Sequence, residues 1–167
     1  MQSVANNGDF KLGVTMDTLG YSDDERLSRS DIARVQLVKA IELFVAEQFI
    51  PSITLGGAAE EIFGRLLERR GEKPVLEESF AAIQRIRDAT GLNVMEGKNK
   101  TEIITDWNKA RNSLKHHGRA DDEFVVINTC DEAYWMIRRA LDNAKRLGVA
   151  IPNEHDFENW VVINVNM

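Results

Sequence analysis

The chain has 167 residues, of which 43% are hydrophobic and 29% charged, as in a globular protein with one hydrophobic core. No run approaches the roughly 18 apolar residues of a membrane span, and the N-terminus lacks the basic-then-apolar order of a signal peptide. The net charge of −6 argues against a nucleic-acid coat protein, and the lone Cys130 excludes an intrachain disulfide, so we expect a cytoplasmic protein without membrane contact.

The first two helices are predicted around a proline. One helix is expected to begin near Ser28 or Ser30 and to end before Pro51, because a proline pushes the preceding residue out of the α region. A second is expected from Pro51 or Ser52 to about Arg70. The apolar residues of the first recur at helical spacing and are Ile32, Val35, Val38, Ile41, Phe44 and Val45.

Two adjacent glycines, Gly56 and Gly57, fall inside the second predicted helix. Mid-helix glycine costs about 1 kcal/mol relative to alanine, so the pair indicates either close packing of another helix or a hinge. A third helix is expected after Pro74, with Gly91 as its C-terminal stop.

The segment from Asn99 to Gly118 reads as one helix, with Asn99 and Glu102 in a capping-box arrangement and Gly118 as its stop. Arg111 falls within the predicted apolar stripe, where a guanidinium needs an anionic partner. The stripe comprises Ile103, Ile104, Trp107, Ala110 and Leu114.

The C-terminal part combines a helix with two β-like stretches. Residues 123–128 look extended, Thr129 is expected to cap a helix with Glu132 at the capping-box position, and Gly148 closes that helix. The sequence Val-Val-Ile-Asn occurs at 125–128 and again at 161–164. We expect short β segments near 124–128 and 160–165 that pair with each other or with a second subunit, unless the repeat is a coincidence of composition.

These elements predict an all-α protein, a five-helix antiparallel bundle with one or two short β segments. The predicted organisation is an N-terminal arm over 1–22, a helical bundle domain over 23–150 and a C-terminal tail over 151–167.

Metal and cofactor sites are not expected. No glutamate has a histidine three residues later, as carboxylate-bridged bundles require, and the two glycines lack the context of a phosphate-binding loop. The segment from Lys98 to Arg119 carries a net charge of +4, so it could meet a phosphate backbone, although solvated surface charge is the alternative.

One motif remains, Arg111-Asn112-Ser-Leu-Lys-His116. An arginine, a polar residue and a histidine after four intervening positions, late in a small helical protein, resemble the HEPN superfamily (higher eukaryotes and prokaryotes nucleotide-binding domains). His117 also fits this signature, which allows four to six residues between the arginine and the histidine. Segments 55–62 and 136–143 also resemble a bacterial subgroup of these proteins. The resemblance implies an often dimeric bundle that cleaves RNA without a metal and leaves 2′,3′-cyclic phosphate ends, with Arg111, Asn112 and His116 as catalytic residues.

The motif leaves two interpretations open. In the first, the motif is catalytic. Because Arg111 and His116 would lie about 140° apart on one straight helix, this interpretation requires that the helix unwinds before His116 or that a second subunit of a homodimer completes the site. In the other interpretation Arg111 pairs with a carboxylate such as Glu60 and only fixes helix register. The chain would then be a non-catalytic dimeric module that binds a nucleotide or a partner protein, for instance an antitoxin-like neighbour.

Overall fold

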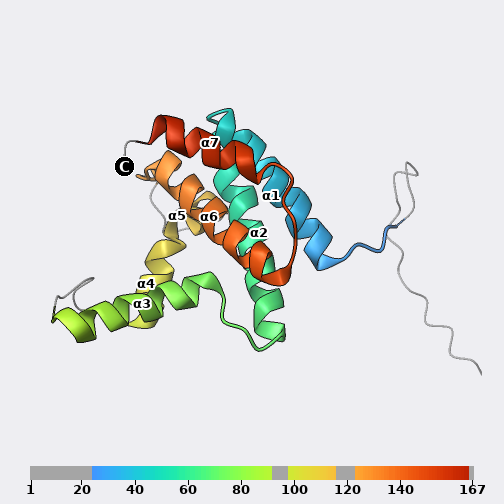
Figure 1. The fold of residues 1–167 in the computed structure, drawn as a ribbon. Coiled ribbons are helices and arrows are strands. Elements are labelled where there is room, and N and C mark those ends of the chain that lie inside the picture. Colours follow the sequence, from blue (N-terminus) through green and yellow to red (C-terminus); the bar gives the residue numbers. More distant parts are fainter. Residues whose placement is uncertain (1–23, 92–97, 116–122, 166–167) are drawn as a thin grey trace, which may run out of the picture.

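The computed structural model describes residues 24–91, 98–115 and 123–165. Over these ranges the chain forms helices and no strand, so the all-α prediction is confirmed. Three helices pack against one another as the core, a fourth lies along α1, and the remaining three stand to one side (Figure 1). The core helices are α1 (Arg29–Val45), α2 (Phe49–Arg69) and α6 (Thr129–Leu147); α7 (Glu154–Asn164) lies along α1; the others are α3 (Val75–Thr90), α4 (Lys100–Trp107) and α5 (Lys109–Lys115).

The chain changes direction between α1 and α2 at residues that precede Pro51. Ser28 caps α1, its Oγ accepting the Asp31 N–H at 3.0 Å, but the helix ends at Val45. Glu47 then takes a positive φ of 58°. Pro51 lies in the first turn of α2, where its missing N–H would have no helical partner in any case. The prediction that Pro51 ends the first helix is therefore wrong.

The aromatic centre of the core joins α1 to α7. The Phe44 ring lies 5.4 Å from Phe49, 5.1 Å from Phe157 and 4.7 Å from Trp160, centroid to centroid, in edge-on arrangements that aromatic pairs favour. Phe44 and Phe157 are fully buried. Residues of the C-terminal segment therefore pack on the same core as α1 and α2.

The β segment predicted at 160–165 is wrong, because residues up to Asn164 belong to helix α7. Phe157, Trp160 and Val161 recur at the i, i+3, i+4 spacing that turns one helical face toward α1. Two exposed residues, Val162 and Ile163, gave the run its strand-like composition. Burial of the aromatic face outweighs that local preference.

The segment before α6 has no regular secondary structure, so the β segment predicted near 124–128 is not found among the described residues. Val125 and Val126 are exposed there. The α6 cap lies one residue earlier than predicted, since the Asn128 side chain accepts the Asp131 N–H at 3.2 Å. The helix ends at Gly148 with a φ of 74°, as predicted.

The helix predicted from Asn99 to Gly118 is divided at Asn108 into α4 and α5. The capping box of Asn99 and Glu102 is present, as predicted. The Asn108 amide donates to the Ile104 carbonyl four residues back at 3.0 Å, a bond that competes with the helical backbone. With the break and α7, the described chain has seven helical segments in place of five. The predicted stop at Gly118 lies outside the described residues, as does the arm over 1–22.

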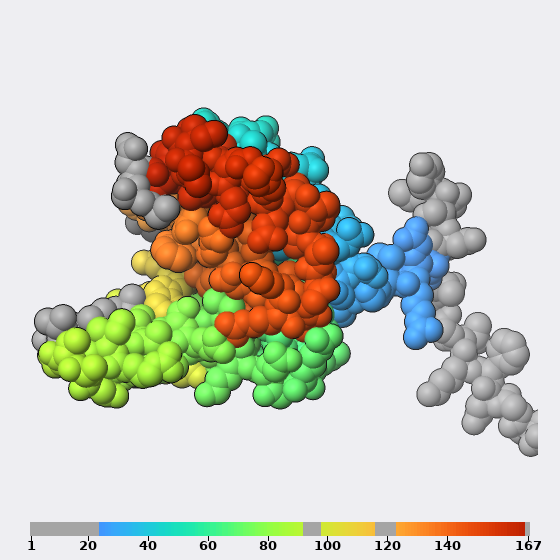
Figure 2. Space-filling view, in the orientation of Figure 1, coloured from blue at the N-terminus to red at the C-terminus, as the bar shows by residue number. Residues whose placement is uncertain are grey.

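Helix α3 is the most peripheral element and forms a ridge beneath α6 in Figure 2; none of its residues is fully buried. Its N-terminus is held by the core, because the buried Asn143 side chain of α6 accepts the Val75 N–H at 3.0 Å. It ends at Gly91 with a φ of 66°, as the sequence predicted. Across the described residues, no helix combines the length and apolarity needed to cross a lipid bilayer.

Candidate functional site

The two glycines of α2 mark close packing, which was the first of the two alternatives. A Cβ on Gly57 would lie 2.4 Å from Cδ of Arg111, which no side chain tolerates without a shift. A Cβ on Gly56 would meet Met136 and Ile137 of α6 at 3.4 Å. Gly57 therefore provides the room in which the Arg111 side chain crosses from α5 over α2.

Arg111 is held at the inner surface of the helices with 12% of its side chain exposed. Its Nη1 donates to the Gly57 carbonyl at 3.3 Å and lies 3.5 Å from Glu60 Oε2 and 3.4 Å from Glu61 Oε2. The pairing with Glu60 is the one that sequence reasoning put forward, whereas Glu61 was missed. Glu61 is half exposed and follows Glu60 directly. The signal that could have identified it was the presence of a second carboxylate next to the proposed partner of Arg111.

Glu60 lies between two arginines. Its second oxygen, Oε1, is 3.9 Å from Nε of Arg139 on α6, and the residue is 4% exposed. Burial raises the pKa of the Glu60 carboxyl, although Arg139 and Arg111 act to lower that pKa. Loss of water thus outweighs the attraction of the two cations. The result is a buried Arg111–Glu60–Arg139 cluster that connects α5, α2 and α6.

Of the other motif residues, Asn112 is among those that the structure describes. It is exposed, as are Lys109 and Lys115 of α5. His116 and His117 lie outside the described residues, so their approach to Arg111 stays a prediction. A pocket of about 260 Å³ borders Arg111, and four of its lining side chains are acidic: Glu60, Glu61, Glu68 and Glu77.

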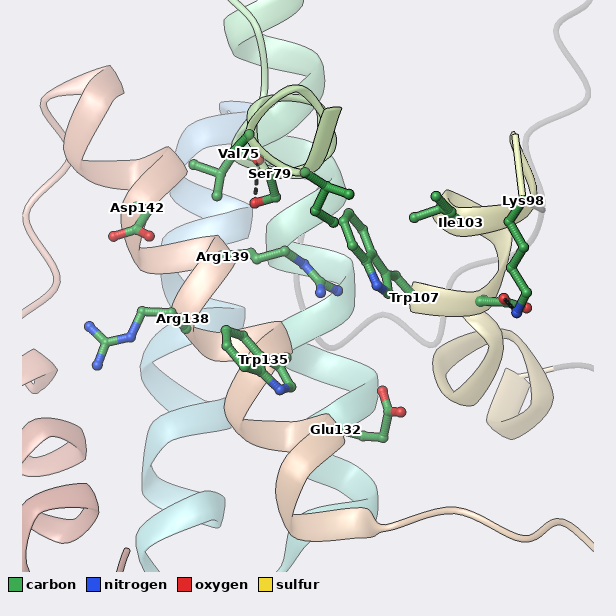
Figure 3. Close-up of a pocket in the computed structure, with 13 residues that line it drawn as sticks. Val75, Ser79, Lys98, Ile103, Trp107, Glu132, Trp135, Arg138, Arg139 and Asp142 are labelled. Atoms are coloured by element: carbon green, nitrogen blue, oxygen red, sulfur yellow. Dashed lines mark hydrogen bonds and ion pairs between the residues drawn. The ribbon is translucent and has the colours of Figure 1, made fainter. Parts of the chain in front are cut away.

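A larger cavity of about 640 Å³ opens between α3, α4 and α6 (Figure 3). Arg139 lines it, between Trp107 and Trp135 in this view, with 9% of its side chain exposed. Sequence reasoning missed this arginine. The signal was present, because position 139 is three residues after Met136 and four before Asn143, both buried.

Metal ligation has no support among the described residues, where no three carboxylate, histidine or cysteine side chains gather to hold an ion. Cys130 is half-buried, and burial raises its pKa, which disfavours the reactive thiolate. A scan against protein-family models, a search of curated proteins and a search of solved structures found no match to the chain.

Proposed function

We propose that the chain is a metal-independent RNA endonuclease of HEPN type, in which Arg111, Asn112 and His116 are the catalytic residues. The observation that carries the proposal is the position of Arg111. Its guanidinium is fixed at the inner helical surface by Glu60 and Glu61, five residues before His116. Lys109 and Lys115 of α5 are exposed cations that suit a phosphate backbone.

The chemistry follows from these side chains. A histidine titrates near neutral pH, so His116 can accept the proton of a ribose 2′-hydroxyl, whose oxygen then attacks the adjacent phosphorus. The bond from phosphorus to the 5′-oxygen breaks, a proton is returned to that oxygen, and a 2′,3′-cyclic phosphate remains. Arg111, always charged, offsets the charge that grows on the phosphorane oxygens, and Asn112 orients the phosphate.

The site is proposed to form in a two-fold dimer. A straight continuation of α5 would separate Arg111 and His116 around the helix, and two copies facing each other bring the arginine of one toward the histidine of the other. Cross-complementation tests this arrangement. Mixed dimers of Arg111→Ala and His116→Ala chains would regain part of the cleavage that each variant alone has lost, and no regain would contradict a shared site.

The direct test is cleavage of mixed RNA by the purified full chain in EDTA. Wild type is expected to produce 2′,3′-cyclic phosphate ends, and His116→Ala and Arg111→Ala are expected to lose at least about a hundredfold in rate. The matched control is His155→Ala, because His155 is an exposed residue of α7 outside the motif. Absent cleavage by wild type, or equal loss in the His155 variant, would contradict the proposal.

A second candidate is a non-catalytic dimeric module of HEPN type that binds a nucleotide or a partner protein such as an antitoxin-like neighbour. One observation favours it: the Arg111 guanidinium already faces two carboxylates, and its pocket has four acidic side chains against two arginines, so an RNA phosphate would meet repulsion there. This function predicts no RNA cleavage in EDTA. It also predicts that His116→Ala leaves partner capture unchanged, measured by pull-down with the full chain.

A further inference from the structure

The cavity between α3, α4 and α6 has the size and walls of a small-molecule site. Its volume of about 640 Å³ falls in the range of about 300–1,000 Å³ that is usual for such sites. Two tryptophans, Trp107 of α4 and Trp135 of α6, face it together with the aliphatic Ile83 and Ile103. Flat aromatic walls of this kind favour a planar apolar body.

The cavity also contains a buried cation without a strong hydrogen-bond acceptor. Arg139 Nε is buried and has no hydrogen-bond partner among the described residues, with the nearest carboxylate oxygen, Oε1 of Glu60, at 3.9 Å. Its Nη2 donates to the Met136 sulfur at 3.1 Å, which is a weak acceptor. A guanidinium that has lost water in this way is expensive unless an anion meets it.

Arg139 has only the long ion pair to Glu60 at 3.9 Å, whereas the other two cations of the cavity have closer partners. Arg138, the next residue on α6, binds both oxygens of Glu158 at 2.6 and 2.9 Å, and in Figure 3 its side chain leaves the helix away from Arg139. Lys98 is paired with Asp106. Arg139 is therefore the cation of this cavity that has capacity for a ligand.

We propose that this cavity binds a small aromatic carboxylate, with the ring between Trp107 and Trp135 and the carboxylate on the Arg139 guanidinium. Guanidinium and carboxylate match in a two-pronged geometry, which favours a carboxylate as the anion. The cavity also carries Glu132 and Asp142, which repel ligands of higher negative charge. The site is separate from the proposed cleavage motif, although Glu60 touches both arginines.

Calorimetric titration of the full chain with three probes of similar size tests the proposal. The probes are 3-phenylpropanoate, its neutral amide 3-phenylpropanamide and the saturated 3-cyclohexylpropanoate. We expect saturable binding of 3-phenylpropanoate, with the amide at least about tenfold weaker because a buried guanidinium is then left without its anion. The cyclohexyl acid is expected to bind more weakly than the phenyl acid. No saturable binding at millimolar concentration, or equal affinity for acid and amide, would overturn the proposal.

The three tryptophans of the chain locate the ligand. Trp107 and Trp135 line the cavity, whereas Trp160 packs on Phe44 in the core. In ¹⁵N-labelled protein, 3-phenylpropanoate should shift the indole N–H signals of Trp107 and Trp135 and leave that of Trp160 in place. The signals are assigned with single Trp→Phe variants. A shift confined to Trp160, or no shift at saturation, would place the ligand elsewhere and overturn the site.

Matched variants separate binding from folding. Arg139→Gln should weaken binding of 3-phenylpropanoate by at least about tenfold. The control is Arg65→Gln, an exposed arginine of α2 that does not line the cavity, and it should change the affinity by less than about threefold. If Arg139→Gln does not fold, Arg139→Lys and Trp135→Ala decide, because lysine keeps the charge and Trp135 is 53% exposed. Unchanged affinity in both of these variants would overturn the proposal.

Discussion

Glu60 is an acid whose burial and pairing act in opposite directions on its pKa. Its pKa in the folded chain lies above the ordinary 4.5, so its contribution to stability is fully present below the unfolded-state pKa and is lost as pH rises through the folded pKa. Glu60→Gln has no such loss. We therefore expect Glu60→Gln to be more stable relative to wild type at about pH 7.5 than at about pH 4, so that its free energy of unfolding minus that of wild type increases with pH.

Urea unfolding of both proteins at the two pH values measures this difference. Glu132, whose pKa is also raised by burial, is present in both proteins, so its contribution largely cancels. A stability difference that stays constant with pH, or that changes in favour of wild type as pH rises, would contradict this prediction. It would show that the two arginines, and not burial, determine the direction of the Glu60 pKa shift.

Gly57 predicts a steric test of the same cluster. Gly57→Ala should destabilise the fold by about 1–3 kcal/mol, because the added Cβ displaces the Arg111 side chain and its ion pairs. Gly64→Ala on the same helix is the control, since its Cβ would make ordinary contacts of 3.5 Å and alanine is the better helix former. In an Arg111→Ala background the cost of Gly57→Ala should disappear. Thermal melts and urea midpoints check this, and an equal cost in both backgrounds would contradict it.

Residue spacing predicted part of this cluster and not the rest. The period of the helix from Asn99 placed Arg111 on the inner face and suggested Glu60 as its partner, and the structure has this pair. Arg139 was missed because it is flanked by Arg138 and lies in a charged helix, where an arginine is usually solvated. Which of two adjacent arginines turns inward depends on what packs against the helix, and the order of residues alone does not say this.

At the scale of single elements, α3 depends on a side chain from another helix. Pro74 precedes α3 without a capping side chain, and the side-chain oxygen Oδ1 of Asn143 on α6 accepts the Val75 N–H in its place. Asn143→Ala should cost about 1–3 kcal/mol, because the partly buried Val75 N–H is left without its acceptor. Hydrogen exchange in the first turn of α3 should rise in the alanine variant, and unchanged exchange would contradict a capping role.

The elements that sequence reasoning missed share one cause. Helix α7 looked like a strand because its exposed residues are β-branched, and Pro51 looked like a stop although it suits the first turn of the next helix. Both signals are local: the strand-like signal of α7 is overridden by packing of Phe44 against Phe157 and Trp160, whereas Pro51 obeys its own preference at the start of a helix and was assigned to the end of the preceding one. Stops set by glycine, such as Gly91 and Gly148, were predicted correctly because backbone sterics alone decide them.

At the scale of the whole molecule, the C-terminal helix completes the core. Phe157 is fully buried against Phe44 and Tyr134, so Phe157→Ala should lower the unfolding free energy by about 3–5 kcal/mol. Removal of residues 156–167 should cost more and should expose Phe44 to solvent. Urea unfolding and binding of a hydrophobic dye check both changes. A truncated chain with the same midpoint as the full one would contradict this role of α7.

The close crossing of Arg111 over Gly57 has a consequence for how related sequences can diverge. A lineage that loses the arginine frees the space above position 57, and any side chain gained there afterwards blocks the return of a long residue at position 111. The order of substitutions is therefore effectively one-way. Homologues are expected to keep glycine at 57 wherever they keep arginine at 111, and to vary at both positions together elsewhere.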